Sequence, residues 1–287
     1  MTRSQPTVEC VPNFSEGRDL TAVDTIAQAV RGTPGARLLD QTSDPDHNRS
    51  VLTFLGPPGT IVAAAVAAVR QAVEALDLTR QTGVHPRLGV ADVVPFVPID
   101  AVTLGDCAAL AREAGARIWH ELGVPVYFYE AAAFRPECRR LESVRKLAPA
   151  GLPPDLGSKP HPTAGVCVVG ARKFLIAWNI NLRTTNLAAA REIAREIRES
   201  SGGLPAVKAL GLPLESRRQV QVSINLVDFE VTPMHIVFDA VADHCRRLGI
   251  EIAGSELIGM IPPAALALSA GHNLHWENLT PRRILSL

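Results

Sequence analysis

Residues 50–76, SVLTFLGPPGTIVAAAVAAVRQAVEAL, hold the pattern that decides the fold. SVLTFLG is an apolar run of strand length, and Gly56 with the two prolines after it ends the run. The apolar residues that follow recur at steps of four and three, on one stripe of a helix: Val62, Val66, Val69, Val73 and Leu76. A strand that leads into such a helix predicts an α/β fold in which helices cover a sheet.

The same alternation extends outward in both directions. Further strands are predicted in VECVPNF (8–14), residues 36–40, VVPFVPI (93–99), VPVYFYE (124–130), KFLIAWNINL (173–182) and QVSINLVDFE (221–230). Asp106 is the predicted N-cap of the helix between the third and fourth of these. Residues 131–166 are rich in Arg, Pro and Gly, and we interpret them as a linker. The expected domains are therefore residues 1–166 and 167–287, with a ligand in the cleft between them.

The charge balance excludes several classes of partner. Lys and Arg together number 29, as do Asp and Glu, so the formal net charge is zero. We therefore expect no nucleic-acid surface and no polybasic membrane anchor. The first ten residues contain no apolar segment of the secretory type, and the cysteines are odd in number and scattered: Cys10, Cys107, Cys138, Cys167 and Cys245. Free thiols and a cytoplasmic location are the expectation.

Asp40 and the loop DPDHNR (44–49) concentrate hydrogen-bonding groups between two predicted strands. Binding residues gather in loops that a rigid scaffold holds, although a solvated turn is the simpler interpretation of Asp, Asn and Pro. Asp44, Asp46 and His47 are also of the types that hold a metal. No second cluster supplies further ligands, so no metal site is expected.

His85 stands in the segment TGVHPRLG (82–89), between two glycines and before a proline. It precedes an apolar strand, which places it near the N-terminal end of that strand. Histidine titrates near neutral pH and suits proton transfer. The alternative is a surface histidine that hydrogen-bonds a loop. A metal-dependent hydrolase that uses His85 with Asp44, Asp46 and His47 is a more distant alternative.

The segment GSKPHPTAG (157–165) predicts an ordered loop without regular secondary structure. Its backbone amides and Lys159 could hold an aromatic, polyanionic ligand, while an interdomain linker is the alternative. The chain contains no GxSxG, Walker A or GxGxxG motif, so hydrolase, nucleotide and dinucleotide functions lack support.

Long blocks of the chain closely resemble the glutamate formimidoyltransferase family. In order, they are VECVPNFSEGRD (8–19), LLDQTSDPDHNRSVLTFLGPP (38–58), TGVHPRLGVADVVPFVPI (82–99), VGARKFLIAWNINL (169–182), ESSGGLPAVKALG (199–211), QVSINLVDFEVTP (221–233) and SELIGMIP (255–262). The resemblance is to the bacterial single-activity type and to the N-terminal part of formimidoyltransferase-cyclodeaminase. It implies an α/β (α+β) fold of two ferredoxin-like sandwich subdomains with a substrate tunnel between them, and a homodimer.

The resemblance also implies a reaction and its residues. The substrates would be N-formimidoyl-L-glutamate and tetrahydrofolate, and His85 of the HPR motif would be the general acid and base. Asp40 and Arg49 would assist it, and Asn48, Arg87 and Arg172 would bind the substrate. The family's folate-binding segment corresponds to Gly157, Ser158, Lys159, Pro160, His161, Pro162, Thr163, Ala164 and Gly165.

Two departures from the family's pattern stand out. The stretch around residues 131–157 is compact and the C-terminus comes early, so parts of the folate tunnel could differ. No cyclodeaminase activity is expected from this chain. Two alternatives stay open: a different one-carbon donor such as N-formylglutamate, and a non-catalytic folate-binding paralogue. Histidine breakdown is the expected metabolic setting.

Overall fold

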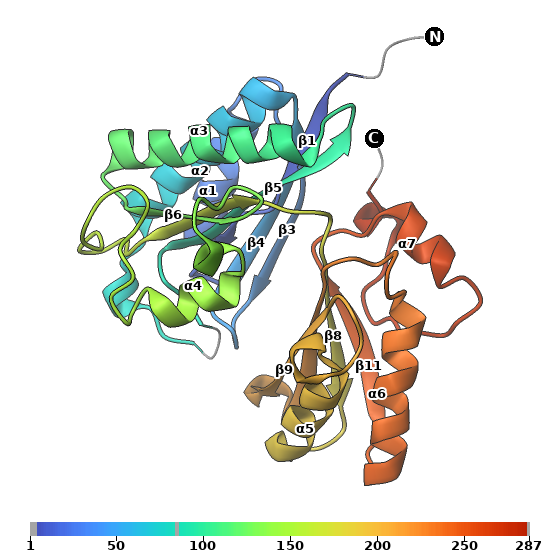
Figure 1. Cartoon of the computed structure of the whole chain (residues 1–287). Coiled ribbons are helices and arrows are strands. Elements are labelled where there is room, and N and C mark those ends of the chain that lie inside the picture. The colour runs from blue at the N-terminus through green and yellow to red at the C-terminus, as the bar shows by residue number, and fades with distance from the viewer. Residues whose placement is uncertain (1–4, 84–85, 286–287) are drawn as a thin grey trace. The chain divides into compact units, whose positions relative to one another are not determined.

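The computed structural model describes residues 5–83 and 86–285. The chain divides into two compact units, Met1–Lys173 and Phe174–Leu287, each a mixed α/β structure (Figure 1). The strands of the first unit are β1 (Thr7–Cys10), β2 (Asn13–Phe14), β3 (Arg37–Asp44), β4 (Arg49–Gly56), β5 (Ala91–Asp100), β6 (Val126–Glu130) and β7 (Cys167–Ala171). Its α-helices are α1 (Leu20–Arg31), α2 (Pro58–Ala75), α3 (Leu104–Leu122) and α4 (Leu141–Leu147).

The first sheet is a ferredoxin-like core with an extension. β1 and β2 form one interrupted line between β4 and β5, and β3 pairs with the outer side of β4. These pairings are antiparallel, and the chain runs β-α-β-β-α-β through them. Beyond β5, the strands β7 and β6 add to the sheet in parallel. The sequence-based expectation of a ferredoxin-like sandwich is confirmed for this unit.

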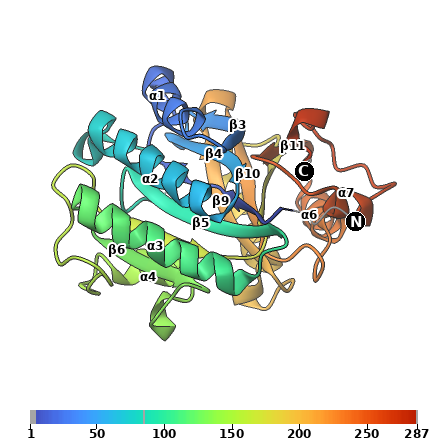
Figure 2. The ribbon, with the colours of Figure 1, turned by 90° about the horizontal axis from the view of Figure 1, so that it is seen from above.

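The alternation of residues along the strands separates the two faces of this sheet. α1, α2 and α3 form one layer on one face (Figure 2), where Phe54, Phe96 and Phe128 are buried beneath them. Tyr127 and Tyr129 point to the opposite face and pack with α4. A period of two along each strand therefore sorts the core into two clusters.

The opposite face is polar where it leaves α4 and crosses β1 to β5. Five polar residues point to this face: Glu9, Asn13, Asp40, Arg49 and Thr53. Glu9, Asn13 and Thr53 alternate along their strands with residues that pack under the helices. Asp40 pairs with Thr53, and Arg49 precedes Ser50, which pairs with Phe14 of the helical face. We call these five residues the polar face. Glu9, Asn13 and Thr53 are nonetheless buried.

Residues 131–166 are part of the first unit and not a linker. Cys138 and Val144 from this segment pack against Tyr127, Tyr129 and Val168 of the sheet. The strand β7 that follows lies between β5 and β6. Residues 131–166 and β7 therefore fold with the first unit. The boundary between the two units lies after Lys173, whereas the sequence predicts a boundary after residue 166.

The second unit repeats the ferredoxin-like plan. Its elements are β8 (Ile176–Leu182), α5 (Leu187–Ile197), β9 (Val207–Leu214), β10 (Gln219–Leu226), α6 (Met234–Leu248), β11 (Ile252–Ile258) and α7 (Pro263–Leu268). The strands pair antiparallel in the order β11-β8-β10-β9. Trp178 is the centre of its core and stacks on Phe238 at 6.2 Å between ring centroids. Within the described part of the chain, no helix is long and apolar enough to cross a membrane.

The start of α3 differs from the sequence-based expectation. Thr103 and not Asp106 is the N-cap: its hydroxyl accepts a hydrogen bond from the Asp106 backbone N–H. Asp106 accepts from the Thr103 N–H at 2.9 Å in return, which completes a capping box. Asp106 does belong to the start of this helix, but it is the third residue of the helix and not the N-cap.

Gly115 on α3 provides a test of this packing. A Cβ at this position would lie 2.5 Å from Cε1 of Phe128. We expect Gly115→Ala to lower the free energy of unfolding by up to ~2 kcal/mol, because overpacking costs about 1–3 kcal/mol and the gain in helix propensity is only about 1 kcal/mol. Urea unfolding followed by circular dichroism measures the change.

Gly105→Ala on the same helix is the matched control. A Cβ there meets only the Thr103 hydroxyl at 3.6 Å, an ordinary contact. This variant should be neutral or more stable than wild type. A Gly115→Ala protein as stable as the Gly105→Ala protein would show that α3 and β6 are not packed as described.

Candidate functional site

The loop between β3 and β4 is closed by local hydrogen bonds. One carboxylate oxygen of Asp44 accepts from the His47 backbone N–H, and the other lies 2.9 Å from His47 Nδ1. Burial opposes ionisation of Asp44, but its contacts with His47 outweigh burial and lower its pKa. Within residues 5–83 and 86–285, no three His, Cys, Asp or Glu side chains are placed to hold a metal ion.

Asn48 ties this loop to two other segments. It adopts a left-handed backbone with φ of 48°, which asparagine tolerates better than most residues. Its Oδ1 accepts from the Gly17 N–H at 2.9 Å, and its Nδ2 donates to Gln81 Oε1 at 2.7 Å and to the Thr82 carbonyl at 2.9 Å. Asn48 therefore organises the site, and substrate contact by Asn48 stays a prediction.

Glu16 holds the other side of the same junction. One oxygen of its carboxylate accepts from the backbone N–H groups of Gly17, Arg18 and Asp19, and the other accepts from Gln81 Nε2 at 2.9 Å. Burial works against ionisation, yet these hydrogen bonds lower the pKa of Glu16. The carboxylate of Glu16 therefore serves to hold this junction together through its hydrogen bonds.

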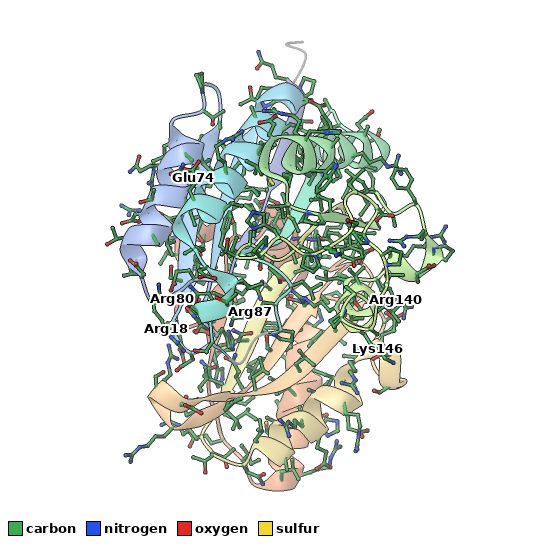
Figure 3. The ribbon with its side chains drawn as sticks, turned by 90° about the vertical axis from the view of Figure 1, so that its left-hand side faces the viewer. Arg18, Glu74, Arg80, Arg87, Arg140 and Lys146 are labelled. Carbon is green, nitrogen blue, oxygen red and sulfur yellow. The ribbon has the colours of Figure 1, made fainter. Side chains whose placement is uncertain are left out.

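A small pocket opens beside this junction. Its lining includes Asn13, Asn48, Arg49, Arg87 and Asp92. The sequence-predicted residues Asn48, Arg49 and Arg87 are therefore brought together, although they come from two separate loops. Figure 3 shows Arg87 on the same side of the first unit as Arg18 and Arg80.

Two arginines line this pocket, and a third, Arg145, pairs with the buried carboxylate of Asp92. Asp92 Oδ2 lies 2.5 Å from Arg145 Nη2, and the charge of Asp92 also acts on Arg49 and Arg87. Burial, and then the charge of Arg145, lower the pKa of Arg49 to about 10. The carboxylates of Asp44 and Glu16 also act on Arg49 and Arg87, respectively. Guanidinium groups gathered in this way are suited to bind a carboxylate.

Asp92 also anchors the segment that follows His85. Its Oδ1 accepts from the Leu88 backbone N–H at 2.7 Å, and Arg87 Nη2 donates to the His47 carbonyl at 3.0 Å. A Cβ on Gly83 would lie 2.4 Å from Arg87 Nη2 and 2.5 Å from the His47 carbonyl oxygen. Only glycine fits there. His85 itself lies outside the described residues.

Sequence reasoning missed Asp92 and Arg145. An aspartate at the start of the apolar run ADVVPFVPI is an available signal, because a buried carboxylate needs a partner. Nothing in the sequence identifies Arg145 as that partner, since α4 brings it from a segment 53 residues further along.

Asp40 and Arg172 lie on the first sheet, outside the set that lines the pocket. Asp40 is on β3 opposite Thr53, and its Oδ2 accepts from the Thr42 hydroxyl at 2.7 Å. Arg172 directly follows β7, and its charge acts on Glu9 and Tyr129. The catalytic part predicted for Asp40 and the substrate contact predicted for Arg172 stay predictions.

The predicted folate segment is a closed, hydrogen-bonded loop. His161 and Gly165 exchange two backbone hydrogen bonds, and His161 Nδ1 accepts from the Ala164 N–H at 3.0 Å. The loop's end is fixed beside the pocket, because the Ala164 carbonyl accepts from the Val90 N–H. Ser158, Lys159 and Pro160 are exposed. A folate-binding part for this loop stays a prediction.

The Asp92–Arg145 pair gives a direct stability test. Asp92→Asn keeps an acceptor for the Leu88 N–H but leaves the arginine cluster without its buried carboxylate. Breaking a buried pair in this way should lower the free energy of unfolding by about 3 kcal/mol. Urea unfolding measures it, and Asp92→Asn/Arg145→Met should recover part of the loss. A single variant within about 0.5 kcal/mol of wild type, the range of ordinary surface changes, would contradict the assignment.

Comparison with known proteins identifies the family. Residues 7–172 match the model of the formiminotransferase domain, N-terminal subdomain, and residues 177–282 match that of the formiminotransferase domain. These two ranges correspond closely to the two units of the structure.

Individual relatives agree with the domain match. The chain is 43% identical to a glutamate formimidoyltransferase of Streptococcus pyogenes serotype M1 over 94% of both chains. It is 39% identical to that of Thermoplasma acidophilum over 97% of this chain and 95% of the relative. It is 42% identical over 95% of its length to the formimidoyltransferase-cyclodeaminase of Sus scrofa, of which it spans 53%. The chain belongs to the glutamate formimidoyltransferase (formiminotransferase) family.

Proposed function

We propose that the chain is a glutamate formimidoyltransferase, a folate-dependent enzyme that transfers the formimidoyl group of N-formimidoyl-L-glutamate to N5 of tetrahydrofolate. The products are 5-formimidoyltetrahydrofolate and L-glutamate. The observation that carries the proposal is 43% identity over 94% of both chains to a protein of that name. The cationic pocket adds support, because the donor carries two carboxylates.

The chemistry defines what the protein must supply. N5 attacks the amidine carbon, and a tetrahedral intermediate forms. The bond from this carbon to the glutamate nitrogen then breaks. The attacking N5 loses a proton, and the leaving nitrogen must gain one because an amine leaves only when protonated. One imidazole can carry this proton between the two nitrogens. His85 is the group proposed for that task, and Asp40 is proposed to orient it.

The arginine pocket is proposed to hold the donor. Arg49 and Arg87 can form paired hydrogen bonds to a carboxylate, and Arg145 adds a third cation beside Asp92. Asn48 is proposed to position the same substrate. Much of the rate should come from holding the two substrates in line, since proximity can supply roughly 7–11 kcal/mol.

Tetrahydrofolate is the proposed co-substrate, and residues 157–165 are proposed to contribute to its binding. The fixed end of this loop beside Val90 supports that assignment, because it leads toward the pocket. A cytoplasmic homodimer that acts in histidine breakdown is the proposed setting. N-formylglutamate as donor and a non-catalytic folate binder are the remaining alternatives.

The first prediction concerns turnover. With formimidoylglutamate and tetrahydrofolate, the purified protein should release glutamate while the absorbance of the folate changes. His85→Ala should fold and bind folate but turn over about 10²–10⁴-fold more slowly, because general acid–base catalysis is lost. Unchanged turnover in this variant would remove His85 from the mechanism. An inactive wild type that binds folate would direct the same assay to formylglutamate.

The second prediction concerns the donor. Arg49→Lys should raise the KM for formimidoylglutamate about tenfold and leave the KM for tetrahydrofolate unchanged, because lysine cannot form the paired hydrogen bonds of a guanidinium. Arg80→Lys, at an exposed arginine, is the matched control. If the two variants have the same KM for the donor, Arg49 does not bind its carboxylates.

A further inference from the structure

Gln81 lies at a junction of three segments of the first unit that are far apart in the sequence. It directly follows the short 3₁₀ helix η1 (Leu78–Arg80). Its Nε2 donates to Oε2 of Glu16 at 2.9 Å, and its Oε1 accepts from Nδ2 of Asn48 at 2.7 Å. One amide therefore bridges the loop after β2, the loop between β3 and β4, and the segment that leads to Arg87.

The two partners of Gln81 leave only one pattern of hydrogen bonds open to it. Despite its burial, the backbone hydrogen bonds of Glu16 hold its pKa below the usual value, so Glu16 is ionised at neutral pH and can only accept. The Oδ1 of Asn48 already accepts from the Gly17 N–H, so its Nδ2 faces Gln81 as a donor. Position 81 must therefore donate to one neighbour and accept from the other. A primary amide does both, whereas a carboxylate, an ammonium group or a hydrocarbon cannot.

The junction that this amide closes sets the spacing of Arg49 and Arg87. Arg49 directly follows Asn48 in the chain, and both arginines line the pocket. Asn48 Nδ2 also donates to the Thr82 carbonyl at 2.9 Å, and Arg87 Nη2 donates to the His47 carbonyl at 3.0 Å. Each loop is thus bonded to the other on both sides of the pocket's edge. A shift of one loop against the other would change the distance between the two guanidinium groups.

We propose that Gln81 is a positioning residue for the donor site, and that its amide holds the two loops where Arg49 and Arg87 meet the carboxylates of formimidoylglutamate. The inference rests on the proposed function, which supplies this donor. Gln81 is not among the residues that line the pocket, and it acts through Asn48. Charged groups that are held in place before the ligand arrives need not be ordered when it binds, which raises affinity.

Gln81→Glu removes the donor of this bridge and nearly keeps its size. The new carboxylate then faces that of Glu16, and their repulsion should loosen the junction. Formimidoylglutamate titrated calorimetrically into the full-length protein at pH 8 should bind about tenfold more weakly than to wild type, because the bridge is lost. Tetrahydrofolate should bind both proteins equally.

Gln71→Glu is the matched control. Gln71 also donates to a glutamate, Glu74, at 2.6 Å, but it lies on α2, which contributes no residue to the lining of the pocket. This variant should bind formimidoylglutamate as wild type does. A loss of donor affinity as large as that of Gln81→Glu would show that the effect is not specific to the junction and would contradict the proposal.

Exchange of the two groups should restore the bridge. In Glu16→Gln/Gln81→Glu the amide at position 16 donates, and the carboxylate at position 81 accepts from it and from Asn48. The net charge equals that of wild type, and the amide oxygen at position 16 can still accept from the backbone N–H groups. The affinity for formimidoylglutamate should return close to the wild-type value. If the double variant binds as weakly as Gln81→Glu, the bridge does not position the site, and the proposal is wrong.

Thermal unfolding separates positioning from a purely structural part. A Gln81→Glu protein that melts at a lower temperature but binds the donor as wild type does would make Gln81 structural only. Gln81→Met loses both hydrogen bonds without adding a charge, and it provides the same comparison if the carboxylate variant does not fold. Because these readouts need no turnover, a wild type that binds the donor but transfers nothing would contradict the proposed function alone.

Discussion

The buried carboxylate of Asp92 is the contact on which the candidate site depends. It accepts from the Leu88 N–H with one oxygen and lies against Arg145 with the other. The negative charge of Asp92 also acts on Arg49 and Arg87. Without Asp92, the positive charges of these arginines and Arg145 would repel one another where they are partly removed from water. The same group therefore places the segment after His85 and sets the positive charge that a carboxylate substrate would meet.

The ferredoxin-like topology explains why the site can be polar on one side and well packed on the other. Helices α1 to α3 cover one face of the sheet, and the other face of β1 to β5 carries the polar side chains of Glu9, Asn13 and Thr53. The stability of the unit comes from the helical face and from the smaller cluster under α4. Unsatisfied polar groups can persist on the remaining surface because the packing elsewhere supports them.

Local pattern predicted the fold well. The strand and helix in residues 50–76 are β4 and α2, because their periods of two and about 3.6 are set by the residues themselves. Errors arose where tertiary contacts decide. Residues 131–166 have little periodicity, which predicts a linker, yet Cys138 and Val144 pack on the sheet. The N-cap of α3 is Thr103, three residues before the predicted cap, because Thr103 and Asp106 hydrogen-bond to each other's backbone N–H groups in a capping box.

The sequence predicts only those residues of the candidate site that stand in recognisable local segments. Arg49 and Arg87 stand in segments rich in polar residues and glycine, and the structure brings them to one pocket. Arg145 could not be found this way, because only the fold places it beside Asp92. Gln81 could not be found either, because its partners Glu16 and Asn48 come from segments 65 and 33 residues away in the chain.

The central claim is that this chain moves a formimidoyl carbon between two nitrogens. The most direct measurement follows formimidoylglutamate labelled with ¹³C at that carbon by NMR during a single turnover with tetrahydrofolate. The account predicts that the labelled carbon becomes bonded to N5 of the folate while one glutamate is released for each carbon transferred. Label that stays on glutamate, or that emerges as free formamide or formate, would contradict it.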